Sequence, residues 1–156
     1  MERPEGTRPA TPLSIIRDEL ARRPGGNALI LVVERDPFVQ KLERYFLEKA
    51  GFAVEFSDDG VQALARARTL KPDILVSEIL VPQMDGLSVC RALKSDPATR
   101  GIVVLILSVL AAEQRALEAG ADAFLIKPLD DTLLIQSVGR LLEKQRKSGA
   151  NDHGTD

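Results

Sequence analysis

Four residues that could do chemistry each follow a short apolar run in the sequence. They are Glu34, Glu78, Ser108 and Lys127. Because the carboxyl ends of parallel strands meet at one edge of a sheet, these side chains are expected to converge although they are far apart in the chain. Carboxylates that face a lysine and a hydroxyl could hold a divalent cation and a phosphoryl group, since oxygen ligands bind the metal while the cation and the lysine neutralise the phosphoryl oxygens. Charged residues gather at any solvated loop rim, but three charged residues and a hydroxyl at four strand ends favour a site.

The elements that must position these residues alternate regularly from residue 28 onward. The branched, fully apolar run Leu29–Val33 is typical of a strand buried on both faces. Asp36 and Pro37 supply an N-cap and a first-turn proline for the helix that follows. The predicted strands are Leu29–Val33, Phe52–Phe56, Ile74–Ser77, Ile102–Leu107 and Ala123–Ile126, and the predicted helices are 37–51, 61–70, 87–94, 112–119 and 130–144.

Strands that alternate with helices predict an α/β fold, because parallel strands need helical crossovers. We therefore expect a flavodoxin-like, doubly wound, five-stranded parallel sheet with helices on both faces. Glu55 interrupts the second strand, as an edge strand tolerates, and this favours the strand order 2-1-3-4-5.

Composition excludes several classes of function. The chain has 156 residues, of which 44% are hydrophobic and 28% are charged, and this matches one globular domain. With 21 basic against 23 acidic residues the formal charge is -2, which argues against non-specific nucleic-acid binding. The longest nearly apolar run, 102–112, is far shorter than the roughly 20 residues of a membrane span. Cys90 and His153 are single, so one chain offers no disulfide, no Cys/His zinc site and no Ser/His/Asp triad.

The two ends of the chain differ from its middle. Residues 1–27 begin with a proline-rich, polar segment without an apolar signal region, so we expect no secretion and a cytoplasmic location. Leu13, Ile16 and Leu20 recur at helical spacing, which favours a short helix from Leu13 to Arg23 within an otherwise disordered extension. This extension is either a linker or an arm for docking or homodimerisation. Residues 146–156 are polar and are expected to be a disordered tail.

The middle of the chain, from Ala28 to Lys144, resembles the receiver domain of two-component response regulators of the CheY-like family. The matching motifs are LILVVERDP, KPDILVSEILVPQMDG, LILS and EAGADAFLIKPL. In that family an acidic pair after the first strand binds magnesium, and an aspartate that ends the third strand accepts a phosphoryl group from a histidine kinase. The resemblance implies a receiver-like domain over 28–145, a phosphoryl-contacting hydroxyl at Ser108, a pairing lysine at Lys127, a switching aromatic at Phe124 and a cis Lys127–Pro128 bond.

The pocket departs from this family pattern at two positions. The acceptor position is Glu78 instead of aspartate, and the second member of the acidic pair is Arg35, while Glu34 is an acceptable first member. Glu34, Arg35, Glu78 and Lys127 together carry no formal charge, so little attraction for a metal ion remains. We expect the Arg35 guanidinium to lie where the metal would and to pair with Glu78 or Glu34. The extra methylene of Glu78 displaces its carboxylate by roughly 1.5 Å, which disturbs in-line phosphoryl transfer.

A third departure lies between Ser108 and Gly120. By comparison with the family, this segment is shorter by about three residues, nearly one helical turn. Receivers commonly bind partners on the face made by the fourth helix, the fifth strand and the fifth helix, so that face is expected to differ here. Phe124 replaces the common tyrosine and has no hydroxyl, which favours an inward, packed position over a switching one.

Three functional hypotheses follow. The first is a pseudo-receiver, a signalling domain that binds a protein partner, such as a histidine kinase or an output protein, without aspartyl phosphorylation, and that has no enzymatic activity, metal or cofactor. The alternative is a phosphorylatable single-domain response regulator of a two-component system. The third, a flavodoxin-like cofactor carrier, is disfavoured because the acidic sequence Glu-Arg-Asp-Pro after the first strand repels phosphate.

Overall fold

The computed structural model describes residues 28–154 and contains one parallel sheet of five strands in the order β2-β1-β3-β4-β5. The fold class and the strand order expected from the sequence are therefore confirmed. The strands are β1 (Leu29–Val33), β2 (Ala53–Ser57), β3 (Ile74–Ser77), β4 (Val103–Ser108) and β5 (Ala123–Ile126). The helices are α2 (Pro37–Lys49), α3 (Gly60–Leu70), α4 (Gly86–Ser95), α5 (Glu113–Glu118) and α6 (Asp131–Gly154).

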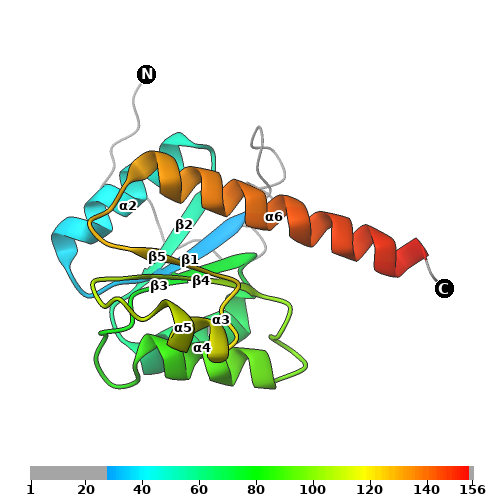
Figure 1. Ribbon diagram of the computed structural model, residues 1–156, viewed down its shortest axis with the longest axis horizontal. Coiled ribbons are helices and arrows are strands. Elements are labelled where there is room, and N and C mark those ends of the chain that lie inside the picture. The colour runs from blue at the N-terminus through cyan, green and yellow to red at the C-terminus, as the bar shows by residue number, and fades with distance from the viewer. Residues whose placement is uncertain (1–27, 155–156) are drawn as a thin grey trace, which may run out of the picture.

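The helices form two layers, one on each face of the sheet (Figure 1). Helices α2 and α6 pack over one face, where Leu47 and Leu134 join the inward side chains of the strands. Helices α3, α4 and α5 pack over the other face, around Leu93 and Ala116. All residues of β1, β3 and β4 are buried, because these central strands are covered on both sides. The described residues include no helix that is both long and apolar enough to cross a membrane.

Aspartates fix the starts of the helices beside the carboxyl edge of the sheet. Asp36 caps α2, Asp59 caps α3 and Asp85 caps α4, each accepting a hydrogen bond from a backbone N–H of the first turn. A Cβ atom added at Gly86 would lie 2.3 Å from the carbonyl oxygen of Glu78, so only glycine lets α4 begin this close to the candidate site.

The ends of some elements differ from expectation. Strands β2 and β4 begin and end one residue later than predicted, so Ser108 is the last residue of β4. Helix α6 continues to Gly154 instead of ending near residue 144, and the segment expected to be disordered from 146 is helical as far as Gly154. No proline interrupts this segment, and Lys147 pairs with Glu143 one turn earlier at 3.4 Å. The helix expected over Leu13–Arg23 lies outside the described residues.

Candidate functional site

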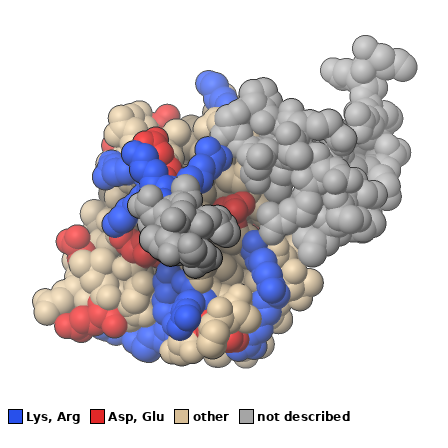
Figure 2. Space-filling view, turned by 90° about the vertical axis from the view of Figure 1, so that its right-hand side faces the viewer, with Lys and Arg blue, Asp and Glu red and all other residues tan. Residues whose placement is uncertain are grey.

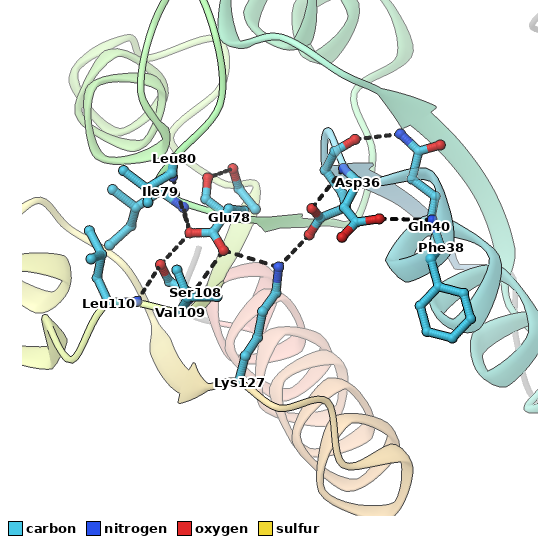
Figure 3. Close-up of polar contacts among 12 residues, drawn as sticks. Asp36, Phe38, Gln40, Glu78, Ile79, Leu80, Ser108, Val109, Leu110 and Lys127 are labelled. Carbon is cyan, nitrogen blue, oxygen red and sulfur yellow. Dashed lines mark hydrogen bonds and ion pairs between the residues drawn. The ribbon is translucent and has the colours of Figure 1, made fainter.

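Three of the four residues singled out in the sequence, Glu78, Ser108 and Lys127, lie together at the carboxyl edge of the sheet in Figure 3, and Glu34 joins them through its ion pair with Lys127. Glu34 follows β1, Glu78 follows β3, Ser108 ends β4 and Lys127 follows β5. The parallel register aligns Val33 with Ser77, so the next residues of both strands, Glu34 and Glu78, emerge side by side. The sheet topology therefore brings all four side chains to one place, as the apolar runs before them predicted.

One carboxylate oxygen of Glu78 is held by three donors. Its Oε2 accepts hydrogen bonds from the backbone N–H groups of Ile79 at 2.6 Å and Leu80 at 3.1 Å, and from the hydroxyl of Ser108. The Glu78 residue is only 4% exposed. A buried carboxylate needs such donors, because they replace the hydration that burial removes.

The other oxygen of Glu78 faces a lysine that it shares with Glu34. Its Oε1 accepts a hydrogen bond from the Val109 N–H at 3.1 Å and lies 3.0 Å from the Lys127 ammonium. The same ammonium lies 2.6 Å from Oε1 of Glu34, whose second oxygen accepts the Asp36 N–H at 3.1 Å. Lys127 therefore bridges two buried carboxylates, as the dashed lines from its Nζ in Figure 3 show.

These contacts shift the pKa values of both partners toward their charged forms. Burial raises the pKa of Glu78, but hydrogen bonds from Ser108 and the Leu80 N–H, together with Lys127, outweigh burial and leave it below its ordinary value. Burial lowers the pKa of Lys127, but the hydrogen bonds and charges of Glu34 and Glu78 outweigh it, so this pKa is raised. Glu78 and Lys127 are therefore an ionised, hydrogen-bonded pair at neutral pH.

Replacing Ser108 with alanine is expected to lower the free energy of unfolding by about 1–3 kcal/mol at neutral pH, because a buried carboxylate loses a donor. The lowered pKa of Glu78 contributes stability that is present above the ordinary value of 4.5 and is lost as the pH falls through the folded-state pKa. The difference between the two proteins should therefore shrink below pH 4.5, as measured by urea unfolding. Ser95→Ala, which alters an exposed hydroxyl, is the control and should change stability by less than about 0.5 kcal/mol. An equal effect of both variants would contradict this account of Ser108.

Arg35 does not occupy the pocket, and the predicted guanidinium pairing is wrong. Arg35 is exposed, and within residues 28–154 it makes no hydrogen bond or ion pair with Glu34 or Glu78. Successive residues of an extended segment point to opposite sides, so an inward Glu34 places Arg35 toward solvent. Among the described residues, the ammonium of Lys127, instead of Arg35, is the cation that contacts both carboxylates.

The residues present do not fit a magnesium ion. In the part of the chain that the structure describes, no group of three His, Cys, Asp or Glu side chains is placed to hold a metal. Oε1 of Glu34 and Oε1 of Glu78 both form an ion pair with the Lys127 ammonium. Magnesium prefers several oxygen ligands in an octahedral arrangement, and this pocket offers an ammonium in their midst.

A functional candidate that sequence reasoning missed is Glu43. It is 2% exposed on the inner face of α2, and its Oε1 has no hydrogen-bond partner. Burial, followed by the charge of Glu34, raises the pKa of Glu43 from 4.5 to about 8. The signal was present in the sequence, because Glu43 lies one helical turn before the buried Leu47 and therefore on the apolar stripe.

The segment that follows β5 keeps one feature that the resemblance implied. The Lys127–Pro128 peptide bond is cis. Phe124 is half-buried and packs against the core cluster of the α3–α5 layer. Helix α5 has only six residues, and beside it Phe124, Ile126 and Leu133 line a groove of about 430 Å³. The role of Phe124 as a switch or as a fixed core residue stays a prediction.

Comparisons with known proteins place these features in a family. The sequence profile of the response regulator receiver domain matches residues 30–139. The chain is 35% identical to the DNA-binding dual master transcriptional regulator RpaA of Synechocystis over 74% of its length, and 39% identical to the response regulator PleD of Caulobacter vibrioides over 74%. It spans 49% of the first relative and 26% of the second, half their length or less.

Solved structures agree with this assignment. The signal receiver domain of a histidine kinase from Syntrophus aciditrophicus is 37% identical, with a TM-score of 0.70 over 75% of this chain and 91% of that one. The receiver domain of the sensor histidine kinase PA1611 from Pseudomonas aeruginosa, solved with magnesium in its active-site cleft, is 26% identical, with a TM-score of 0.69 over 74% of this chain and 98% of that one. With its parallel sheet and the four strand-end residues described above, the chain belongs to the response regulator receiver domain family of two-component signalling.

Proposed function

We propose that this receiver domain is a pseudo-receiver, which presents one fixed surface to a protein partner without aspartyl phosphorylation. The partner is a protein component of a signalling pathway, either a histidine kinase or an output protein. On this proposal the domain is a cytoplasmic signalling module and has no enzymatic activity of its own. On the face in Figure 2, Lys and Arg side chains lie among acidic and uncharged ones, and this mixture together with the formal charge of -2 disfavours nucleic acid as the partner.

The observation that carries the proposal is the complete engagement of the Glu78 carboxylate. The groups that the family uses to hold a phosphoryl group, a hydroxyl at Ser108 and a lysine at Lys127, are both bound to Glu78 itself. Its two oxygens accept five contacts in all, so neither is free to attack a phosphorus atom. Phosphoryl transfer would first have to break several of these buried contacts, and the described residues of the pocket would then lack a set of carboxylates that fits a metal ion to neutralise the incoming charge.

The length of the Glu78 side chain explains how this engagement arises. Glutamate carries its carboxylate farther from the backbone than aspartate does, and here it reaches Ser108 and the Val109 N–H on β4 and the loop after it. The negative charge thus sits among the donors that would otherwise surround a phosphoryl group. We infer that Glu78 holds the pocket in an arrangement like that of a phosphorylated receiver.

Incubation of the protein with acetyl phosphate and magnesium is expected to leave its intact mass unchanged. The matched control is the double variant Arg35→Asp with Glu78→Asp, which restores a second acidic residue and the shorter acceptor. This variant should gain magnesium affinity in titration calorimetry and a mass increase of one phosphoryl group, because the shorter aspartate at position 78 releases the contacts that engage Glu78 and the charge next to Glu34 changes from positive to negative.

A phosphoryl adduct on the unaltered protein would support the alternative, a phosphorylatable response regulator. A double variant without any gain in magnesium affinity would contradict the charge argument. The single variant Glu78→Asp separates the two substitutions, since it shortens the acceptor and leaves Arg35 in place.

A further inference from the structure

Glu43 is a buried acid that the proposed function does not use. It lies on the inner face of α2 between Gln40, whose amide donates to the backbone carbonyl of Glu34, and the core residue Leu47. The residue is 2% exposed and its Oε1 has no hydrogen-bond partner. Burying a carboxyl oxygen without a partner costs free energy, so an apolar side chain at this position would give a more stable protein. An acid at this position therefore calls for a functional explanation.

The charged groups that face Glu43 come from the pocket. They are Glu34 after β1, Glu78 after β3 and Lys127 after β5, and all three act on the Glu43 carboxyl through their charges. In the described residues no Lys or Arg nitrogen lies within 4.0 Å of Glu43, so the ammonium of Lys127 is committed to the other two carboxylates. Glu43 is thus an uncompensated neighbour of an ion cluster.

The other elements packed against α2 bring no further charge to this position. Strand β2 contributes Val54 and Phe56 to the core layer beneath α2, and its Glu55 pairs with Arg66 of α3 on the other face of the sheet. Helix α6 contributes apolar residues to the same layer, and its Asp131 is exposed. On α2 itself the exposed Arg44 pairs with Glu48. The pocket is therefore the only charged environment, among the described residues, that Glu43 can sense.

We propose that Glu43 is a proton-binding site that regulates the pocket, keeping Lys127 on Glu34 and Glu78 while it is protonated and drawing the ammonium away when it ionises. On ionisation the O–H bond of the Glu43 carboxyl breaks, the proton passes to solvent water, and the carboxylate retains the electron pair. Loss of the lysine contact leaves Glu78 held by its hydrogen bonds alone. The signalling consequence rests on the proposed function, since it is the engaged Glu78 that defines the fixed surface.

Charge explains the direction of this coupling. With Glu43 neutral, two carboxylates and one ammonium leave a formal charge of -1, and ionisation brings it to -2 in a buried site. Three carboxylates then compete for one cation, which is costly where water is scarce. The pKa of Glu43, raised to about 8 by burial first and by Glu34 next, places this step in the mildly alkaline range.

The test is an NMR titration of the protein labelled with ¹³C at the glutamate carboxyl and with ¹⁵N at the amides, from about pH 6 to about pH 9.5. The Glu43 carboxyl resonance is expected to titrate near pH 8. The amide resonances of Leu80 and Val109, which donate to Glu78, should shift with the same midpoint. Both amide shifts should vanish in Glu43→Gln, and Glu43→Leu serves the same purpose if the glutamine variant does not fold.

Glu55→Gln is the matched control, because Glu55 is a partly buried, paired carboxylate on the far face of the sheet. It should leave both amide transitions unchanged. A Glu43 carboxyl that is already ionised at about pH 6 and does not titrate in this range, or amide shifts that persist in both Glu43 variants, would overturn the proposal. These outcomes are independent of the phosphoryl transfer test, because they measure proton binding in the isolated protein and need neither a phosphodonor nor a partner.

Discussion

Lys127→Met is expected to lower the free energy of unfolding by about 3–5 kcal/mol, because removal of one partner strands two buried charges. Glu34 and Glu78 are 3% and 4% exposed at their side chains, and Lys127 is the cation that contacts both. Methionine keeps the length and the apolar stem of lysine, so the loss reports the charge and its hydrogen bonds. Urea unfolding followed by circular dichroism at neutral pH measures it.

The matched control is Lys147→Met. Lys147 forms an exposed ion pair with Glu143 on α6, and the loss of such a pair should cost less than about 1 kcal/mol. A triple variant, Glu34→Gln with Lys127→Met and Glu78→Gln, should recover much of the lost stability, since it removes the stranded charges as well. Equal destabilisation by the Lys127 and Lys147 variants would show that the buried ion pairs of Lys127 contribute no more to stability than an exposed ion pair does.

Glu43→Leu is expected to raise the free energy of unfolding by up to about 5 kcal/mol above pH 8. This size follows from the difference between the ordinary pKa of 4.5 and the folded value of about 8, at about 1.4 kcal/mol for each unit. Between these pH values the unfolded chain has lost the proton that the folded protein keeps, so the stability of the unaltered protein falls as the pH rises. The gain from leucine should therefore be small near pH 4.5 and largest near pH 8. Thermal and urea unfolding across this range measure it.

Glu48→Leu on the same helix provides the comparison. Glu48 is exposed and pairs with Arg44 at 3.2 Å, so its replacement should change stability by less than about 1 kcal/mol at any pH in this range. A gain from Glu43→Leu that is the same at both ends of the range would mean that leucine improves packing only, and that Glu43 does not hold a proton in the folded state.

The sequence predicted the fold because its signals are local and repeated. Apolar, branched runs such as Leu29–Val33 specify strands covered on both faces, and the starts of α2, α3 and α4 carry aspartate caps such as Asp36 and Asp85. The edge position of β2 was indicated by Glu55 and is confirmed by the strand order. The end of α6 was less predictable, because polar residues beyond Lys144 can continue a helix as readily as they can leave it.

Four members of the candidate site were predicted correctly in their positions, whereas Arg35 was placed in the pocket and is exposed. The strand ends place Glu34, Glu78, Ser108 and Lys127 at one edge, but their charges alone do not say which cation reaches which carboxylate. Arg35 was assigned the role that Lys127 has, because formal charge carries no information about the direction of a side chain. Glu43 was missed, because an acid on a helix is expected to face solvent and only the turn-by-turn spacing to Leu47 showed otherwise.

The reach of Lys127 has a mechanical consequence for the sheet. Within residues 28–154, strand β5 lies at the edge of the sheet and pairs only with β4, yet the lysine that follows it is anchored to Glu34 at the end of β1, three positions inward. The Lys127 side chain therefore crosses the carboxyl edge of the sheet and connects the edge strand β5 to the interior strands β1 and β3. The carboxyl end of β5 cannot separate from the sheet without breaking these two buried ion pairs. We therefore expect this end of β5 to fray less than its amino end.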